Sequence, residues 1–182
     1  AINDKNICND IKCLEREESM ISIGKQLMQD SELNKVTWEK FDILQDEIKE
    51  KADLVITSYM INELPKEMRQ KAVEKLWKAT NKLLVIIEPG TPAGFANILE
   101  IRKNILEDDL VDCILSMPSN LFYTVTIPCS IWILNRNKKQ KGKTLFIDAR
   151  NFGTMVTRKL RELNEDDISK IADTYHNFQN NQ

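Results

Sequence analysis

Glycine is scarce in this sequence, and no Gly-x-Gly motif occurs. The five glycines are well separated from one another: Gly24, Gly90, Gly94, Gly142 and Gly153. Glycine-rich loops let a backbone approach a bound cofactor closely, because glycine has no side chain. The sequence therefore lacks the most recognisable cofactor-binding loop of the nucleotide-binding folds.

Histidine and paired cysteines are also lacking. His176 is the one histidine, and none of the four cysteines lies in a Cys-x-x-Cys pair. This composition excludes the common zinc motifs, so we predict no metal site. No Ser/His/Asp triad is visible either. Cys13, Cys113 and Cys129 lie in or beside apolar runs, which is typical of buried thiols and favours a reducing, cytoplasmic location.

Long apolar runs and an excess of one charge are absent as well. The longest purely apolar run, residues 83–87, is too short to cross a membrane, and the first residues do not resemble a signal peptide. The formal net charge is -2, so no overall basic field attracts nucleic acid or lipid. The basic stretches, residues 136–143 and 158–161, are more typical of solvated turns than of nucleic-acid-binding patches.

What the sequence does contain is an alternation of strand-like and helix-like patterns. We predict strands near residues 11–14, 35–38, 53–58, 83–87, 111–116, 129–134 and 144–147. Helices are predicted near residues 18–29, 65–80 and 95–106, and a last one after Asn164. This alternation predicts an α/β fold with a mostly parallel sheet and helices on both faces. Residues 1–182 are expected to form one domain, with a disordered tail at 177–182.

Ligands of an open α/β sheet bind at the carboxyl ends of its strands. The residues in or just after the ends of the predicted strands are therefore the site candidates: Glu15, Asp42, Ser58, Tyr59, Asn62 and Glu88. A carboxylate in the position of Glu15 can accept hydrogen bonds from both hydroxyls of a ribose. The alternative is that Glu15 belongs to the acidic, solvated start of a helix, together with Glu17 and Glu18.

Two loops are further candidates. Residues 88–92, Glu-Pro-Gly-Thr-Pro, form a rigid turn after a buried strand, which suits a functional loop or simply a tight connection. Residues 117–123 place aromatic and amide side chains after another strand, where they could stack on a base. Alternatively, Leu121 and Phe122 of this loop belong to the core.

The first part of the chain, residues 11–100, resembles the ribosomal small-subunit methyltransferase-like family of bacteria and mitochondria. The stretches that carry this resemblance are CLER at 13–16, ADLVITSYMINEL at 52–64 and EPGTPAGF at 88–95. The last of these is specific to the family.

The second part, residues 101–180, is similar to the modification (N6-adenine methyltransferase) subunit of type I restriction systems. The carrying stretches are DLVDCI at 109–114, PSNLFY at 118–123, IWILN at 131–135, LFIDARN at 145–151 and ISKIADTYH at 168–176. The chain thus looks like a recombinant of two related domains, natural or designed, with a seam near residues 100–104.

Both resemblances imply a Rossmann-like class I core that uses S-adenosylmethionine. They imply that Glu15 holds the ribose, that Asp42 faces the adenine amino group, and that Ser58 lies on the cofactor side. Tyr59, Asn62 and Glu88 would approach the transferring methyl group as the catalytic residues. All of these side chains are then expected to line one cleft.

The first strand of that core, its glycine-rich loop and the Asn-Pro-Pro-aromatic motif that holds a target adenine are all absent from this sequence. We therefore expect weak or absent cofactor binding and an impaired or inactive enzyme. Without the first strand, the strands at 11–14 and 53–58 are expected to pair directly, because this needs no long-range rearrangement. The alternatives are that another strand, such as residues 144–147, moves into the gap or that a second chain supplies the missing strand. Oligomers through exposed sheet edges are expected, and no membrane contact.

Three functions remain open at this point. The first is a methyltransferase-like domain that acts on, or docks against, rRNA or DNA. The second is a non-catalytic binding or assembly module for a ribosomal partner or a DNA-specificity subunit. The third is an engineered chimeric fold without function.

Overall fold

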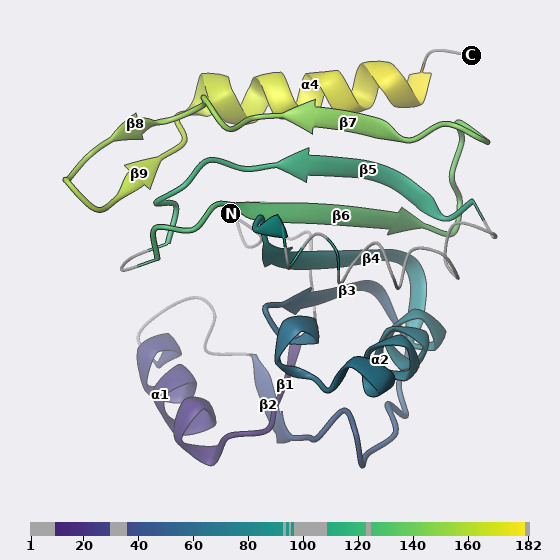
Figure 1. Cartoon of the computed structure of the whole chain (residues 1–182). Helices are drawn as coiled ribbons and strands as arrows, with labels where there is room; N and C mark the ends of the chain where they lie inside the picture. Colours follow the sequence, from purple (N-terminus) through teal and green to yellow (C-terminus); the bar gives the residue numbers. More distant parts are fainter. Residues whose placement is uncertain are drawn as a thin grey trace. The chain divides into compact units, whose positions relative to one another are not determined.

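The computed structural model describes residues 10–29, 36–92, 94, 96, 109–122 and 125–180. The chain divides into two compact units, Ala1–Glu47 and Ile48–Gln182. The described part of the first unit consists of β1 (Lys12–Glu15), α1 (Glu18–Met28) and β2 (Thr37–Lys40), all labelled in Figure 1. The expectation of one domain over residues 1–182 stays a prediction.

In the first unit, β1 and β2 form a parallel two-stranded sheet in which Glu15 is paired with Lys40. Helix α1 packs closely on this sheet at Gly24. A Cβ atom added to Gly24 would collide with the indole ring of Trp38 in β2. Glycine is therefore needed here for the close approach of helix and strand, not for a ligand.

The second unit contains a five-stranded sheet in the order β3-β4-β6-β5-β7. Its elements are β3 (Ala52–Ser58), the 3-10 turn η2 (Ile61–Glu63), α2 (Lys66–Lys78), β4 (Thr80–Pro89), β5 (Val111–Ser116), β6 (Cys129–Asn135) and β7 (Leu145–Asp148). Strands β3, β4, β5 and β7 run in one direction and β6 runs against them. The apolar run at 83–87 lies in β4, between β3 and β6, as a strand that is apolar on both faces should.

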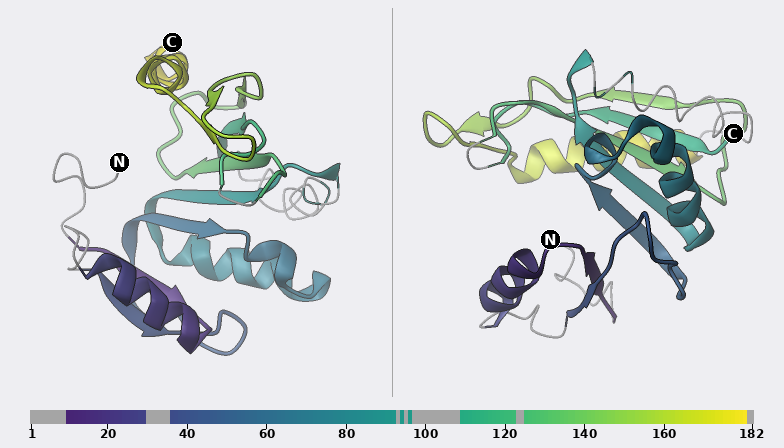
Figure 2. Two further views of the ribbon diagram at one scale, coloured as in Figure 1. Left: turned by 90° about the vertical axis from the view of Figure 1, so that its left-hand side faces the viewer. Right: turned by 60° about the horizontal axis from the view of Figure 1, so that its bottom comes forward.

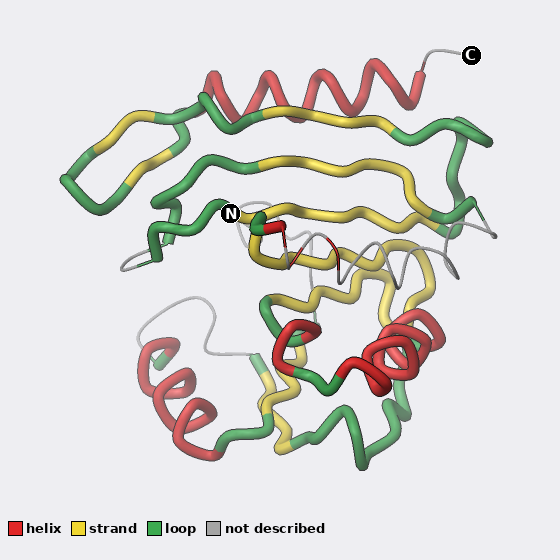
Figure 3. Tube along the Cα trace, in the orientation of Figure 1, coloured by secondary structure: helices red, strands yellow, loops and turns green. Residues whose placement is uncertain are grey.

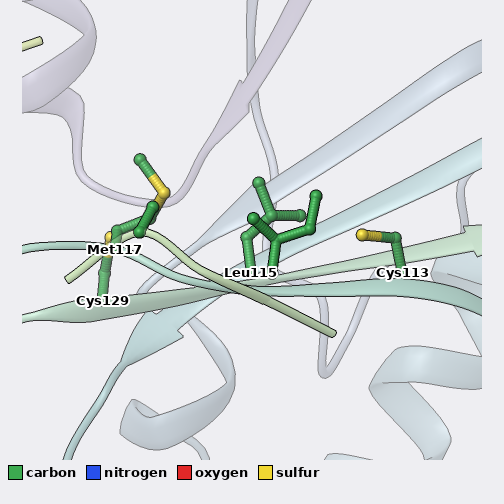
Figure 4. Close-up of a cluster of buried hydrophobic side chains, with 6 residues drawn as sticks. Cys113, Leu115, Met117 and Cys129 are labelled. Atoms are coloured by element: carbon green, nitrogen blue, oxygen red, sulfur yellow. The ribbon is translucent and has the colours of Figure 1, made fainter. Parts of the chain in front are cut away.

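Each face of this sheet carries apolar side chains. On one face the buried cluster comprises Cys113, Leu115, Met117, Cys129, Ile147 and Ala149, four of which are labelled in Figure 4. Ile171 and Tyr175 of α4 (Glu165–Asn180) pack against this cluster. Helix α2 packs against β4, and Figure 2 (right) shows α2 in front of the sheet with α4 behind it. The prediction of helices on both faces is thus confirmed.

Helix α4 continues to Asn180, well past the start of the tail that the sequence predicts at residue 177. Its last turns are held by Asp112, a fully buried carboxylate in β5. Asp112 accepts hydrogen bonds from the hydroxyl of Tyr175 (2.8 Å), the amide of Gln179 (2.9 Å) and the amide of Asn135 (2.8 Å). Residues 177–180 are therefore helical, because a long-range contact that no local pattern announces fixes Gln179.

A short hairpin precedes α4. It consists of β8 (Thr154–Met155) and β9 (Arg161–Glu162), which pair antiparallel. Figures 1 and 3 show it at the same end of the second unit as the carboxyl ends of β5 and β7. This hairpin is not predicted from the sequence, because two-residue strands carry no periodicity.

Two expectations have different outcomes. Among the described residues β1 pairs only with β2, and β3 pairs only with β4, so the expected direct pairing of β1 with β3 is not found. The helix expected at 95–106 lies outside the described residues except for Ala96. Within the described ranges, no helix is long and apolar enough to cross a membrane.

Candidate functional site

The carboxyl ends of the parallel strands in the second unit bring several candidate residues to one edge. Ser58 at the end of β3 is in register with Ile87 of β4, so that Tyr59 and Glu88 follow side by side. On the other side of β6, β5 ends at Ser116, and the amide of the next residue, Met117, donates to the carbonyl of Cys129 (2.8 Å). We call this region the carboxyl edge.

Glu88 is fully buried at the carboxyl edge. Its Oε1 accepts the backbone N–H of Ile61 at 2.9 Å, which ties β4 to the η2 turn. Its Oε2 is buried and has no hydrogen-bond partner among the described residues. Burial raises the pKa of Glu88, although the amides of Ile61 and Asn62 and the charge of Arg69 act in the opposite direction. Glu88 is thus held by the protein through one oxygen, while the other has no donor among the described residues.

Tyr59 lies in the turn directly after β3 and adopts a left-handed backbone conformation, with φ of 58°. Its N–H donates to the carbonyl of Ile87 (2.8 Å), which continues the ladder of β3 and β4 by one residue. The phenol hydroxyl is buried without a nitrogen or oxygen partner among the described residues, and the group nearest to partnering it is the thiol of Cys129. Burial raises the pKa of Tyr59, and the nearby Cys129 and Glu88 raise it further. A non-glycine residue at positive φ is uncommon and costs free energy, so the surrounding structure must enforce it.

Asn62 and Ser58 lie next to these two residues in the chain. Asn62 is half-buried in the η2 turn, and its carbonyl accepts a 3.4 Å hydrogen bond from Arg69 of α2. Arg69 also donates to the carbonyl of Leu64 (3.0 Å), which fixes the connection from η2 to α2. The Ser58 side chain is exposed. Arg69 could not be recognised from the sequence, because an arginine on a helix gives no signal of a backbone contact in the preceding turn.

The loop after β5, residues 117–122, joins the same region. Phe122 meets Tyr59 edge-on, with ring centroids 5.9 Å apart and an interplanar angle of 84°. Leu121 packs against the buried cluster on the α4 face, whereas 41% of the Phe122 side chain remains exposed. The core alternative therefore holds for Leu121. Phe122 combines a packing contact with a solvent-facing ring surface. Tyr123 lies outside the described residues.

Glu15 and Asp42 belong to the first unit, where both are found at the carboxyl end of the β1–β2 sheet. The Oε1 atom of Glu15 accepts the N–H of Glu17 at 2.9 Å. The carboxylate of Asp42 accepts the N–H of Leu44 at 2.9 Å and the amide of Gln45 at 3.1 Å. Both oxygens of Asp42 thus stabilise a local turn. That Glu15 and Asp42 share one cleft with Tyr59 and Glu88 stays a prediction.

The two basic stretches have partly structural roles. Arg136 lies over the ring of Trp77 and donates to the carbonyls of Thr80 and Trp77. Lys138 is buried and pairs with Asp109 at 2.5 Å. Arg136 and Lys138 of the first stretch therefore connect segments of the second unit to one another. In the second stretch, Arg161 donates to the carbonyls of Phe152 and Gly153, while Arg158 and Lys159 are exposed.

None of the glycines provides a cradle for a cofactor at the carboxyl edge. Cβ atoms added to Gly90 and Gly94 would meet the backbone oxygens of Pro128 and Pro89, so these glycines serve the packing of chain against chain. Gly153 likewise faces the carbonyl of Glu162, and Gly142 lies in the turn between β6 and β7, at the other end of the sheet. No group of three or more potential metal ligands occurs among the described residues.

Comparison with solved structures defines the class. The fold resembles a type I restriction-modification methyltransferase subunit from Streptococcus thermophilus, with a TM-score of 0.64, 16% identity, and coverage of 93% of this chain and 42% of that chain. It also resembles a class I S-adenosylmethionine-dependent methyltransferase from Listeria monocytogenes, with a TM-score of 0.62, 16% identity, and coverage of 93% and 55%. The chain therefore has the Rossmann-like fold of class I methyltransferases.

Family models give a more specific assignment. Residues 67–182 match the N-6 DNA methylase family, and residues 5–118 match the mitochondrial small ribosomal subunit Rsm22 family. Each match spans more than half of the chain, so the chain belongs to the N-6 DNA methylase family and, through its first part, to the Rsm22 family. The two matches overlap at residues 67–118, and the seam expected near 100–104 falls inside this overlap. Both predicted resemblances are confirmed.

Curated relatives agree with this double assignment. The type I restriction enzyme HindI methylase subunit of Haemophilus influenzae is 56% identical over 80 residues, which cover 44% of this chain and 18% of that protein. The human mitochondrial ribosome assembly protein METTL17 is 28% identical over 102 residues, which cover 52% and 22%. The chain thus spans about a fifth of the length of these relatives. It is a methyltransferase-like domain related to type I restriction-modification methylase subunits.

Proposed function

We propose that this chain is a methyltransferase-like domain that acts on, or docks against, nucleic acid, with adenine in DNA or rRNA as the substrate class. The observation that supports this proposal is a pair of buried atoms at the carboxyl edge, Glu88 Oε2 and the Tyr59 hydroxyl. Neither has a nitrogen or oxygen hydrogen-bond partner among the described residues. A buried polar atom without a hydrogen bond costs about 1–3 kcal/mol. Such an edge is suited to a ligand that brings its own polar groups.

Adenine can form the hydrogen bonds and the stacking contact that these residues offer. Its amino group donates hydrogen bonds, which matches the unpaired Glu88 oxygen, and its ring can stack on the exposed surface of Phe122. Asn62 lies in the η2 turn that Glu88 holds, and its side-chain amide would be a further hydrogen-bonding group for the base. Tyr59, Asn62 and Glu88 are therefore proposed as the residues nearest to the reacting base.

The residues for the cofactor fit only in part. Glu15 keeps one carboxylate oxygen for a ribose, and Ser58 has an exposed hydroxyl at the carboxyl edge. Asp42 already uses both oxygens within its turn, and no described glycine offers backbone to the methionine part of S-adenosylmethionine. We therefore propose weak cofactor binding by this chain and assign no methyl-transfer step to it.

Calorimetric titration with S-adenosylmethionine tests this proposal. We expect no binding tighter than roughly millimolar, which corresponds to about 4 kcal/mol. A micromolar dissociation constant that is lost in Glu15→Ala, and retained in the matched surface variant Glu18→Ala, would show instead that a working cofactor site exists. Exposed Glu18 lies in the first turn of α1, close to Glu15 in the chain.

A second candidate function is a non-catalytic assembly module. The observation that favours it is the match to the Rsm22 family together with a relative that is named a ribosome assembly protein. Purified small ribosomal subunits and a purified DNA-specificity subunit are the two probes that separate the possible partners. Stable co-sedimentation with the ribosomal subunit, without nucleic-acid methylation, would favour this function. Binding to neither probe and to no nucleic acid would favour a chimeric fold without function.

A further inference from the structure

We infer that the β8–β9 hairpin is a contact for the phosphate backbone of duplex DNA, placed beside the carboxyl edge. This inference rests on the proposed nucleic-acid function and names a surface that would hold the substrate. It starts from two cations at the tip, Arg158 and Lys159, which are exposed and whose side chains form no ion pair among the described residues. Residues 154–161 contain no acidic side chain.

The tip is closed by its own hydrogen bonds. The N–H of Val156 donates to the carbonyl of Leu160 at 2.9 Å, and the hydroxyl of Thr157 accepts the N–H groups of Lys159 (3.2 Å) and Leu160 (3.0 Å). The backbone around Arg158 is therefore ordered before any partner arrives. An ordered binding loop loses less conformational entropy on binding than a flexible one.

The base of the hairpin is fixed to the body of the second unit. Arg161 donates two hydrogen bonds, to the carbonyls of Phe152 (3.0 Å) and Gly153 (3.1 Å). The N–H of Gly153 in turn donates to the carboxylate of Asp167 at the start of α4 (3.0 Å). The Arg161 side chain thus holds the hairpin to the second unit, whereas the side chains of Arg158 and Lys159 have no partner in the part of the chain that the structure describes.

A direct chain of contacts joins the hairpin to the candidate site. The N–H of Arg161 donates to the carbonyl of Asn120 at 2.8 Å, and the Asn120 amide donates to the carbonyl of Lys159 at 3.4 Å. Two residues further on, Phe122 contacts Tyr59. A partner held at the hairpin tip would therefore lie close to the carboxyl edge, where the reacting base is proposed to bind.

The shape and charge of the hairpin favour duplex DNA. A two-stranded ribbon can enter the wide major groove of B-form DNA with its cations against the flanking phosphates, whereas the major groove of duplex RNA is too narrow to admit it. Arginine and lysine neutralise phosphates, and this contact does not require a specific sequence. The chain as a whole carries a formal charge of -2, so attraction must come from a local surface of this kind.

The experiment is a fluorescence anisotropy titration of the full chain with a labelled duplex DNA of mixed sequence, repeated over a series of salt concentrations. In the double variant Arg158→Ala/Lys159→Ala we expect about tenfold weaker binding, and a slope of log K against log salt that is smaller by about 2. Lys139→Ala/Lys141→Ala is the matched control, since these exposed lysines lie in the turn between β6 and β7 and the change in net charge is the same. The conservative variant Arg158→Lys/Lys159→Arg should retain binding.

The outcomes separate the two proposals. If the wild-type chain binds neither duplex DNA nor RNA, the proposed nucleic-acid function fails and the hairpin contact fails with it. If the chain binds DNA but the hairpin variant keeps the affinity and salt slope of the wild type, only the hairpin contact is wrong. Equal losses in the hairpin variant and the control would also overturn it, and hairpin-dependent binding that is tighter for duplex RNA would overturn the choice of DNA.

Discussion

The buried carboxylate of Glu88 accepts the N–H of Ile61 at 2.9 Å and so connects the end of β4 to the turn that follows β3. Loss of this acceptor in Glu88→Ala leaves the buried amide of Ile61 without a partner. We expect the free energy of unfolding to fall by about 1–3 kcal/mol. Chemical denaturation measures this loss, and an unchanged midpoint would contradict a structural role for Glu88.

The same residue predicts a pH dependence of stability. Burial raises the pKa of Glu88 in the folded state, so the folded chain binds this proton more tightly than the unfolded chain. Its contribution is present at low pH and is lost as the pH rises from about 4.3, the ordinary pKa of glutamate, through the raised value. In Glu88→Gln this decline should disappear. Urea unfolding at several pH values measures it, with exposed Glu67→Gln in the first turn of α2 as the control, and an unchanged decline in Glu88→Gln would count against a raised pKa.

Tyr59 and Phe122 allow ring and hydroxyl contributions to be separated. Tyr59→Phe removes a buried hydroxyl whose nearest partner is the weakly hydrogen-bonding thiol of Cys129, and it keeps the edge-on ring contact. The free energy of unfolding should therefore stay the same or rise by up to about 1 kcal/mol. Phe122→Ala removes the ring contact and should lower stability by at least about 0.5–1.5 kcal/mol. A destabilised Tyr59→Phe variant would show that the hydroxyl has a structural partner.

Asp112 is expected to control the docking of α4. Its carboxylate accepts hydrogen bonds from Tyr175 and Gln179 of the helix and from Asn135 of β6. Asp112→Ala leaves these donors unpaired and should cost about 3 kcal/mol, with faster amide exchange along α4. Asp173→Ala, on the exposed side of α4, is the control. Equal exchange in both variants would argue against this role.

Thiol reactivity should follow burial. Burial in the β-sheet core, with the nearby Asp112, raises the pKa of Cys113 to about 12, and burial also raises the pKa of Cys129. Because the thiolate is the reactive form, both thiols should resist a disulfide reagent at about pH 8 in the folded chain and react at once in denaturant. Mass spectrometry of the labelled peptides identifies the sites. Rapid labelling of Cys113 under native conditions would contradict the buried position.

Strands β3, β4, β5 and β6 were predictable because each is rich in apolar and β-branched residues. The run at 83–87 identifies β4 as a central strand, and the predicted range 111–116 coincides with β5. The hairpin and η2 were not predicted, since elements of two or three residues depend on distant partners, such as Asn120 for the hairpin and Glu88 for η2.

The ends of the predicted strands place Tyr59 and Glu88 after neighbouring strands, and the register of β3 and β4 shows these two residues side by side. Their roles as site residues stay a prediction. The sequence does not reveal that Asp42 uses its carboxylate within its own turn, because the donors, Leu44 and Gln45, depend on the local backbone conformation. Phe122 shows the same limit, since its ring both packs against Tyr59 and faces solvent.

One oxygen of Asp167 serves two elements. Its Oδ2 accepts the N–H of Gly153 at the base of the hairpin (3.0 Å) and that of Asn164 before α4 (3.3 Å), while the Asn164 side chain accepts the N–H of Asp167 (2.8 Å). Opening of the hairpin at its base removes one of the two N–H donors of an oxygen that also holds the first turn of the helix. We therefore expect hairpin and helix start to be coupled, so that their amide hydrogens exchange with a similar opening free energy.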